Sequence, residues 1–485
     1  MQILSIDQGT TNTKAVLVEA SGRIVAQASS SLVSEYPHPG WAEQSALAIW
    51  ASVQTVIAEI VAQSGPIDGI TIANQRETLV VWDATTSQPV APAILWQCRR
   101  TADACAALLA AGHGPTVTAA TGLAINPLFP ATKLAWVLHN VPEAQALAEK
   151  GTLRAGTVDA WLLWNLTAGA SFATDHSNAS RTMLFNTGAL AWDATLATIF
   201  GVPLNALPTP RPSDSRFGTT ANTTALPPGI PILAMMGDSH AALYGHGIRH
   251  PGTVKATFGT GSSLMALTPK RIGSTHGLSG TIAWTTHEGT AYAIEGNITV
   301  SAQAAAFAAE LLGLPDAAAL SDLAQTVPTS NGVTFVPALA GLGAPHWKDH
   351  ATGTIDGLTL GTRPAHLARA TFEAITLQIA DVFTAIEHDI GTPLADLRAD
   401  GGASANTFLM QLQADVLNRP VIRNDLAEVG ALGAAAMGFA ALGVDPTAVL
   451  SSAGHARVFA PTADPVWRDK TCAQWQAAIR RALAS

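Results

Sequence analysis

Cysteine is scarce in this chain. Its 485 residues include three cysteines, at positions 98, 105 and 472. Three cysteines are too few for a disulfide framework, and their spacing matches no zinc site. Chains without disulfides are typical of reducing compartments. We therefore expect a cytoplasmic protein.

Positive charge is also in short supply. Lys and Arg number 26 against 35 Asp and Glu, so the net charge is −9. Nucleic acids and anionic membrane surfaces attract proteins with the opposite balance. The composition therefore argues against a nucleic-acid groove or a polybasic membrane patch, and we expect neither partner.

Long apolar runs are absent. The most apolar stretch, residues 430–443, consists mainly of Ala and Gly, whereas a membrane-spanning helix needs about 20 apolar residues. The amino-terminal sequence has no basic segment and reaches Asp7 at once, which is unlike a signal peptide. We expect residues 430–443 to form a buried helix that packs closely through its small side chains, and we expect no membrane insertion.

The chain does contain enough apolar residues, 48% of the total, to fill more than one core. Each half opens with the same pattern: a short apolar run, a Gly/Thr/Ser-rich loop and a second apolar run. These runs are residues 3–6 and 14–19 in the first half, and 253–258 and 264–267 in the second. The repeat favours a duplicated α/β fold with domains at 1–247 and 248–485.

The two loops, residues 7–13 and 259–263, are candidate phosphate sites. Such turns present backbone N–H groups and hydroxyls to phosphate oxygens, although ordinary hairpin turns have a similar composition. Asp7 ends the first strand and could hold hydrated Mg²⁺, and Lys14 adds a positive charge. A third glycine site, Gly401-Gly402, precedes Asn406, which could contact a nucleotide or simply cap the helix that begins near residue 407.

Three charged residues at strand ends are candidates for binding and catalysis. Arg76 and Glu77 follow an apolar strand; together they could donate to and accept from vicinal hydroxyls, or they could form a surface ion pair. Asp238 follows another apolar run and is suited to act as general base toward an alcohol, or to begin a helix.

Several motifs together resemble the FGGY family of carbohydrate kinases, most closely its glycerol kinase branch. The match extends over about residues 1–440. The motifs are Asp7-Gln8-Gly9-Thr10-Thr11, Asn74-Gln75-Arg76-Glu77-Thr78, Trp96-Gln97-Cys98-Arg99-Arg100-Thr101, Gly156-Thr157-Val158-Asp159, Asn178-Ala179-Ser180-Arg181-Thr182-Met183-Leu184-Phe185-Asn186, Gly259-Thr260-Gly261 and Gly353-Thr354-Ile355-Asp356-Gly357-Leu358.

The resemblance implies a fold of two ribonuclease-H-like (actin/hexokinase-type) domains with a cleft between them. The first domain would bind the sugar and the second most of the ATP. By the same resemblance, Asp238 is the catalytic base, and Arg76, Glu77 and Trp96 line the acceptor pocket. The nucleotide phosphates and adenosine would be held by Thr10, Thr11, Asn12, Lys14, Thr260, Gly402 and Asn406, with Mg²⁺ near Asp7.

Three positions depart from the glycerol kinase pattern. Leu128 stands where that branch has tyrosine, Ser239 where it has glutamine, and Ser263 where it has phenylalanine. Losing a hydrogen bond to a buried hydroxyl typically costs about 1–3 kcal/mol. We therefore expect a larger acceptor, a four- or five-carbon polyol or ketose, with these three positions among its contacts.

The sequence thus predicts an ATP- and Mg²⁺-dependent kinase that phosphorylates a terminal hydroxyl of a small sugar or polyol, as a monomer or homo-oligomer. Two alternatives stay open. One is a true glycerol kinase with a repacked pocket, and the other is an ATPase of the actin or chaperone class that binds protein partners.

Overall fold

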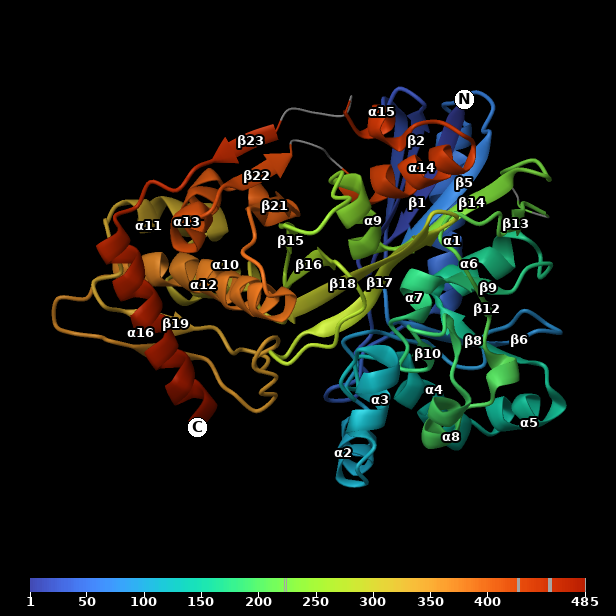
Figure 1. Ribbon diagram of the computed structural model, residues 1–485, viewed down its shortest axis with the longest axis horizontal. Coiled ribbons are helices and arrows are strands. Elements are labelled where there is room, and N and C mark those ends of the chain that lie inside the picture. Colours follow the sequence, from blue (N-terminus) through green and yellow to red (C-terminus); the bar gives the residue numbers. More distant parts are fainter. Residues whose placement is uncertain (222, 224, 425–427, 452–455, 485) are drawn as a thin grey trace. The chain divides into compact units, whose positions relative to one another are not determined.

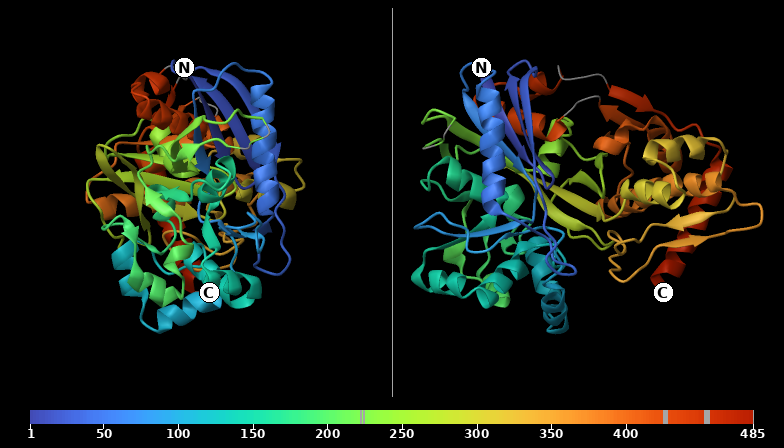
Figure 2. Two further views of the ribbon diagram at one scale, coloured as in Figure 1. Left: turned by 90° about the vertical axis from the view of Figure 1, so that its right-hand side faces the viewer. Right: turned by 180° about the vertical axis from the view of Figure 1, so that it is seen from behind.

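The computed structural model describes the whole chain apart from residues 222, 224, 425–427, 452–455 and 485. The chain forms two compact units, shown in Figures 1 and 2, which we describe separately. Unit 1 comprises Met1–Arg249, Gly280–Ala293 and Leu426–Ala453; unit 2 comprises His250–Ser279, Ile294–Asp425 and Gly454–Ser485. The duplicated α/β fold expected from the sequence is present.

Unit 1 is built on a six-stranded sheet with the order β13-β14-β5-β1-β2-β3. β1, β2 and β3 form an antiparallel meander, and β1, β5 and β14 run parallel. The strands are β1 (Gln2–Gln8), β2 (Asn12–Glu19), β3 (Ile24–Ser31), β5 (Gly69–Asn74), β13 (Gly218–Thr219) and β14 (Pro231–Gly237).

Helices cover both faces of this sheet. Because side chains alternate along a strand, Leu4 and Ile6 of β1 face the core formed with helix α1 (Ala46–Val61). Between them, the Ser5 hydroxyl points to the other face and donates to the Ala431 carbonyl of α14 (Val429–Ala441) at 2.7 Å. The expected buried helix at residues 430–443 is therefore α14.

Small residues allow α14 to approach its neighbours closely. A Cβ atom added to Gly433 would lie 1.9 Å from the Ala241 carbonyl oxygen of α9 (Asp238–Gly245), and one added to Gly438 would lie 2.4 Å from Thr71 of β5. This packing brings the first turns of α9 and α14 to the ends of β1 and β14. No helix among the described residues is long and apolar enough to cross a membrane.

The rest of unit 1 includes a four-stranded sheet with the order β4-β7-β6-β8. Its elements are β4 (Glu43–Gln44), β6 (Leu79–Asp83), β7 (Ala93–Ile94), β8 (Leu153–Thr157), β9 (Ala173–Asp175), β10 (Phe185–Asn186), β11 (Ala191–Trp192), β12 (Thr209–Arg211), α2 (Ala102–Ala110), α3 (Gly114–Thr121), α4 (Pro130–Asn140), α5 (Pro142–Lys150), α6 (Val158–Leu166), α7 (His176–Ala179), α8 (Ala194–Phe200) and the 3₁₀ helix η1 (Leu204–Ala206). Helix α15 (Pro446–Ser451) follows α14 and packs against it.

Unit 2 repeats the strand order of unit 1. Its strands belong to a sheet with the order β17-β18-β16-β15-β21-β22-β23, in which residues 280–293 of β17 and β18 are part of unit 1. β15 runs antiparallel to β16 and parallel to β21. β15 and β16 therefore correspond to β1 and β2, and β21 corresponds to β5. The strands are β15 (Thr253–Phe258), β16 (Ser262–Thr268), β17 (Ser279–Thr286), β18 (Gly289–Ile298), β19 (Thr334–Val336), β20 (Thr354–Asp356), β21 (Asp396–Asp400), β22 (Val421–Asn424) and β23 (Ala456–Phe459).

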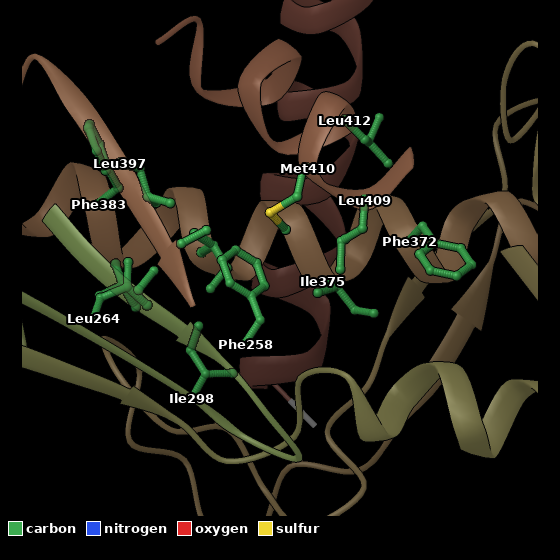
Figure 3. Close-up of a cluster of buried hydrophobic side chains, with 14 of the residues drawn as sticks. Phe258, Leu264, Ile298, Phe372, Ile375, Phe383, Leu397, Leu409, Met410 and Leu412 are labelled. Atoms are coloured by element: carbon green, nitrogen blue, oxygen red, sulfur yellow. The ribbon is translucent and has the colours of Figure 1, made fainter. Parts of the chain in front are cut away.

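The core of unit 2 lies between this sheet and the long helix α12 (Pro364–Ile390). Figure 3 shows Phe258 of the sheet close to Ile375 of α12 and Met410 of α13, with Leu264 on the other side of Phe258. The helices are α10 (Gln303–Leu311), α11 (Ala317–Gln325), α12, the 3₁₀ helix η2 (Gly402–Ala405), α13 (Thr407–Leu417) and α16 (Pro465–Ala484).

The units differ from the expected domains, 1–247 and 248–485, in two segments. Residues 280–293 and the helices α14 and α15 belong to unit 1 although they lie in the second half of the chain. Hydrogen bonds show why for the first segment: Gly280 N–H donates to the Gly122 carbonyl at 2.9 Å, and the Tyr292 hydroxyl donates to the Thr187 carbonyl at 3.1 Å.

Candidate active site

The turn between β1 and β2 presents backbone groups and hydroxyls, as expected for a phosphate site. Gly9 N–H donates to the Asn12 carbonyl at 3.0 Å, which closes the turn. The Gln44 side-chain amide donates to the Thr10 carbonyl at 2.6 Å and fixes the turn from outside. Thr11 and Asn12 are exposed, so their polar groups are available to a ligand.

Thr10 also joins this turn to the predicted acceptor residues. The Trp96 indole N–H donates to the Thr10 hydroxyl at 3.0 Å, and that hydroxyl donates to Gln75 Oε1 at 3.2 Å. Trp96 keeps 38% of its surface exposed, so its ring can contact a ligand. The structure therefore brings the predicted phosphate turn and one wall of the predicted sugar pocket together within unit 1.

Negative charge gathers at the end of β1. Desolvation is the main cause that raises the pKa of Asp7 to about 7, and the charges of Asp238 and Glu428 raise it further, while Lys14 lowers it. Lys14 Nζ lies 2.7 Å from Glu428 Oε1. A Cβ atom added to Gly430 would lie 3.4 Å from Asp7 Oδ2, so the start of α14 is beside this carboxylate.

This carboxylate arrangement suits a hydrated divalent cation. Among the described residues, no group of three or more His, Cys, Asp or Glu side chains is arranged as a metal centre. Mg²⁺ is commonly bound through one or two carboxylates, water and substrate phosphates, which does not require such a group. Asp7 is the residue we expect to bind such a cation, because a positive ion would offset the repulsion from the nearby Asp238 and Glu428 carboxylates.

Asp238 begins α9 and is paired with Arg76. Arg76 Nε donates to Asp238 Oδ1 at 3.0 Å, and its Nη2 donates to the Ser239 hydroxyl at 3.2 Å. The Asp238 side chain is 40% exposed, whereas that of Arg76 is 8% exposed. A Cβ atom added to Gly237 would lie 2.7 Å from Arg76 Cγ and Cδ, so only glycine leaves room for this side chain.

One expectation is corrected here: Asp238 is not a lone carboxylate, because Arg76 pairs with it. Glu77, for its part, accepts a hydrogen bond from Arg181 Nε at 2.6 Å. Neighbouring side chains point apart when the backbone turns, and Glu77 has a left-handed backbone with φ of 61°.

Two buried cations near Glu77 were not predicted as site residues. Arg181 is fully buried, and Lys133 Nζ donates to the carbonyls of Glu77 and Leu128 at 2.9 and 2.7 Å. Burial lowers the pKa of Lys133 to about 7, although Glu77 opposes this. Arg181 lies in the motif that resembles the kinase family, but no local pattern identifies Glu77 as its partner.

Leu128 lies beside this cluster and is partly buried. The backbone N–H of Leu128 donates a hydrogen bond to Asn126 Oδ1 at 2.9 Å. The aliphatic side chain cannot hydrogen-bond a hydroxyl. This wall of the predicted pocket is therefore less polar than it would be with a tyrosine.

In unit 2, the turn between β15 and β16 resembles the first turn. Gly259 N–H donates to the Gly261 carbonyl at 3.0 Å, and Thr260 is exposed. A Cβ atom added to Gly261 would lie 2.4 Å from the Ile298 carbonyl oxygen. Ser263 follows the turn, and its hydroxyl donates to Glu295 Oε1 at 2.9 Å. Ser263 therefore already has a partner within unit 2.

The third glycine site lies at the start of α13. Gly402 is exposed with open space around its Cα, which leaves room for a flat ring. Asn406 caps α13, because its Oδ1 accepts from Leu409 N–H at 3.1 Å, and its Nδ2 donates to Ser321 at 2.9 Å. The capping role considered for Asn406 is therefore present.

Comparison with protein families identifies the class. Residues 2–245 match the N-terminal domain of the FGGY family of carbohydrate kinases, and residues 254–442 match its C-terminal domain. The chain belongs to this family, and it is an ATP-dependent carbohydrate kinase. This membership excludes the actin- or chaperone-like alternative.

Relatives with different acceptors in their names are equally similar. Glycerol kinase of Symbiobacterium thermophilum and apulose kinase of Pectobacterium atrosepticum are each 44% identical over 99% of this chain and 98% of their own. The crystal structure of Plasmodium falciparum glycerol kinase with ADP matches with a TM-score of 0.93 at 31% identity, over 99% of this chain and 98% of that one. Sequence identity therefore does not distinguish the acceptors.

Proposed function

We propose that this kinase transfers the γ-phosphoryl group of ATP to a terminal hydroxyl of a four- or five-carbon polyol or ketose. The observation that carries the proposal is the wall of unit 1 at Leu128 and Ser239. Leucine offers no hydrogen bond there, and Ser239 is shorter than glutamine and engaged with Arg76. A small triol would leave polar groups unpaired in such a pocket.

The relatives are consistent with this class of acceptor. One curated relative is named apulose kinase, and it is as similar as the relatives named glycerol kinase. Apulose is a five-carbon ketose, so a chain of this type can serve an acceptor larger than glycerol. The second candidate is glycerol kinase activity, which the several similar relatives of that name favour.

We assign the general base to Asp238. Its exposed carboxylate takes the proton of the acceptor hydroxyl while that oxygen attacks the γ-phosphorus and ADP leaves. Arg76 orients the carboxylate through its Nε, at 3.0 Å from Oδ1. Arg76 and the Glu77 carboxylate would also bond hydroxyls of the sugar or polyol.

Each glycine turn is proposed as a phosphate-binding element of its own unit. In unit 1, Thr10, Thr11, Asn12 and Lys14 would bind phosphate oxygens, and in unit 2 Thr260 would do so. Gly402 and Asn406 would hold adenosine. Asp7 would hold Mg²⁺, which supplies electrostatic stabilisation of the transferring phosphoryl group.

The test is acceptor kinetics with the purified kinase. Glycerol, erythritol, D-ribulose, D-xylulose and D-apulose are compared by kcat/KM at saturating MgATP. A four- or five-carbon acceptor is expected to have the highest value. Preference for glycerol over every other member would establish the second candidate instead.

A further inference from the structure

Glu77 holds a backbone conformation that side chains disfavour. Its φ is 61°, in the left-handed region, and it is neither glycine nor asparagine. Such residues persist where the surrounding structure determines them, and they gather at functional sites. The groups that determine the conformation of Glu77 are therefore of functional interest.

Two buried cations grip Glu77 at different atoms. Arg181 Nε lies 2.6 Å from Glu77 Oε1 and so fixes the direction of the carboxylate. Lys133 Nζ lies 2.9 Å from the Glu77 carbonyl oxygen and so fixes the peptide plane. Both cationic side chains have 0% of their surface exposed.

The cations are anchored on the segment that carries Leu128. Lys133 Nζ also donates to the Leu128 carbonyl at 2.7 Å, and the Arg181 guanidinium lies 5.2 Å from the centre of the Phe129 ring. Ala131 N–H donates to the Thr182 carbonyl at 3.0 Å, which joins the two anchoring segments. Lys133 thus links the backbone carbonyl of Glu77 to that of Leu128.

A stability role alone gives a weak reason for this arrangement. Burying an ammonium group is costly, and apolar side chains of similar size often replace buried ions without loss. A lysine that bridges two carbonyls does, however, fix the distance between them. A pocket that includes Glu77 and Leu128 needs a fixed distance between these residues to hold a sugar or polyol in one orientation.

We propose that Lys133 and Arg181 are positioning residues of the acceptor site, which fix Glu77 and its distance from Leu128. The proposal rests on the proposed function, because it takes Glu77 as the group that accepts a hydrogen bond from the sugar. Neither cation touches the sugar in this scheme. Each acts through Glu77 or through the Leu128 backbone.

The kinetic test compares Lys133→Met, Arg181→Gln and Arg181→Lys with the wild type. The acceptor is whichever of glycerol, erythritol, D-ribulose, D-xylulose and D-apulose has the highest kcat/KM. Because a misplacement of about 1 Å can cost about 10²-fold, we expect kcat/KM for this acceptor to fall by about 10- to 100-fold in the first two variants. The KM for ATP is expected to stay unchanged, and Arg181→Lys is expected to be intermediate.

Unit 2 offers a closely matched control. Arg369 Nε donates to Glu373 Oε1 at 2.9 Å, and its guanidinium lies 5.2 Å from the Phe408 ring, much as Arg181 lies over Phe129. Arg369→Gln therefore removes a similar pair without touching Glu77. A comparable loss for the acceptor in Arg369→Gln, or an equal loss for acceptor and ATP in the Lys133 and Arg181 variants, would overturn the proposal.

Hydrogen exchange provides a test that needs no acceptor. Amides of residues 75–78 and of residues 128 and 129 are expected to exchange faster in Lys133→Met and Arg181→Lys than in the wild type, and to be unchanged in Arg369→Gln. If no acceptor of the panel is phosphorylated, the proposed substrate class fails, and exchange alone decides the positioning role. Unchanged exchange at these amides would overturn that role. If Arg181→Gln does not fold, the other two variants carry both measurements.

Discussion

At the scale of single residues, Asp238 and Arg76 act as a pair. We predict that Asp238→Asn lowers kcat by about 10²–10⁴-fold, because loss of a general base typically has that effect. The affinity for ATP should be largely retained, because the amide has the size of the carboxylate. Acceptor kinetics and ATP titration of the same preparation measure both effects.

This prediction needs a control because Asp238 forms an ion pair with Arg76. Asp238→Asn also leaves Arg76 without its charged partner, so part of the loss could come from Arg76. Arg76→Met and the double variant separate the two contributions, because residues in contact are not additive. Retention of more than about a tenth of wild-type kcat in Asp238→Asn would contradict the base assignment.

Asp159 makes the stability of unit 1 depend on pH. Burial, with a further contribution from Asp175, raises its pKa from the ordinary 3.8 to about 7. The folded state then binds more protons than the unfolded state between these values. Stability should therefore fall as pH rises from about 4 to about 7, on the order of a few kcal/mol in total.

Asp159→Asn tests this prediction, because an amide cannot ionise. The variant should lose this part of the pH dependence and gain relative to the wild type at pH above about 7. Its amide can still bond the Thr157 and Thr174 hydroxyls, which lie 2.5 and 2.6 Å from the carboxylate oxygens. Urea unfolding across this pH range measures the slope; an identical slope in both proteins would contradict the assignment.

What the sequence could not predict at this scale is the choice of partners. Arg76, Glu77 and Asp238 were identified as site residues from their positions at strand ends. Arg181, however, is 104 residues from Glu77 in the chain, and no spacing rule links residues at that distance. Their pairing follows from the fold, and so does the pairing of Asp238 with Arg76.

At the scale of elements, local sequence signals agree with several helices and strands. Helix α1, for example, has Ser45 as its N-cap, and its buried residues have helical spacing. The small residues that predicted a closely packed helix at 430–443 do pack closely. That α14 packs against α9 of unit 1 was not predictable, because the contact joins distant parts of the chain.

Asn406 has two roles to separate: it caps helix α13, and it is a candidate contact of the nucleotide. We predict that Asn406→Ser keeps the cap of α13, because serine is a good N-cap, while Asn406→Ala costs about 0.5–2 kcal/mol. If Asn406 also holds adenosine, both variants should raise the KM for ATP, since neither has the amide. Thermal unfolding and ATP kinetics separate the roles; normal ATP kinetics in Asn406→Ser would leave capping as its only role.

At the scale of the whole molecule, the sequence indicated the duplication but not which segments each compact unit contains. The two Gly/Thr turns indicated two similar halves, and the strand orders of the units agree with that. Residues 280–293 and α14 belong to unit 1, however, because their backbone and small side chains pair with segments far away in sequence. Composition marks neither segment as part of the first half.

The last prediction concerns which sugar or polyol the kinase phosphorylates best. Leu128 and Ser239 belong to unit 1, and Ser263 belongs to unit 2. We predict that the triple variant Leu128→Tyr, Ser239→Gln and Ser263→Phe raises glycerol turnover relative to the best four- or five-carbon acceptor. Tyrosine and glutamine restore groups that can bond a short polyol, and phenylalanine reduces the space.

Single variants test whether these positions act on one ligand. Effects of residues that contact the same ligand are not additive, so the triple variant should differ from the product of the single effects. The measurement is the ratio of kcat/KM for glycerol to that for the larger acceptor in all four variants and the wild type. Ser263→Phe also removes the hydroxyl that donates to Glu295, so Ser263→Ala is its control. If the ratio does not move toward glycerol in the triple variant, these positions do not set the acceptor, and the case for a larger sugar loses its physical basis.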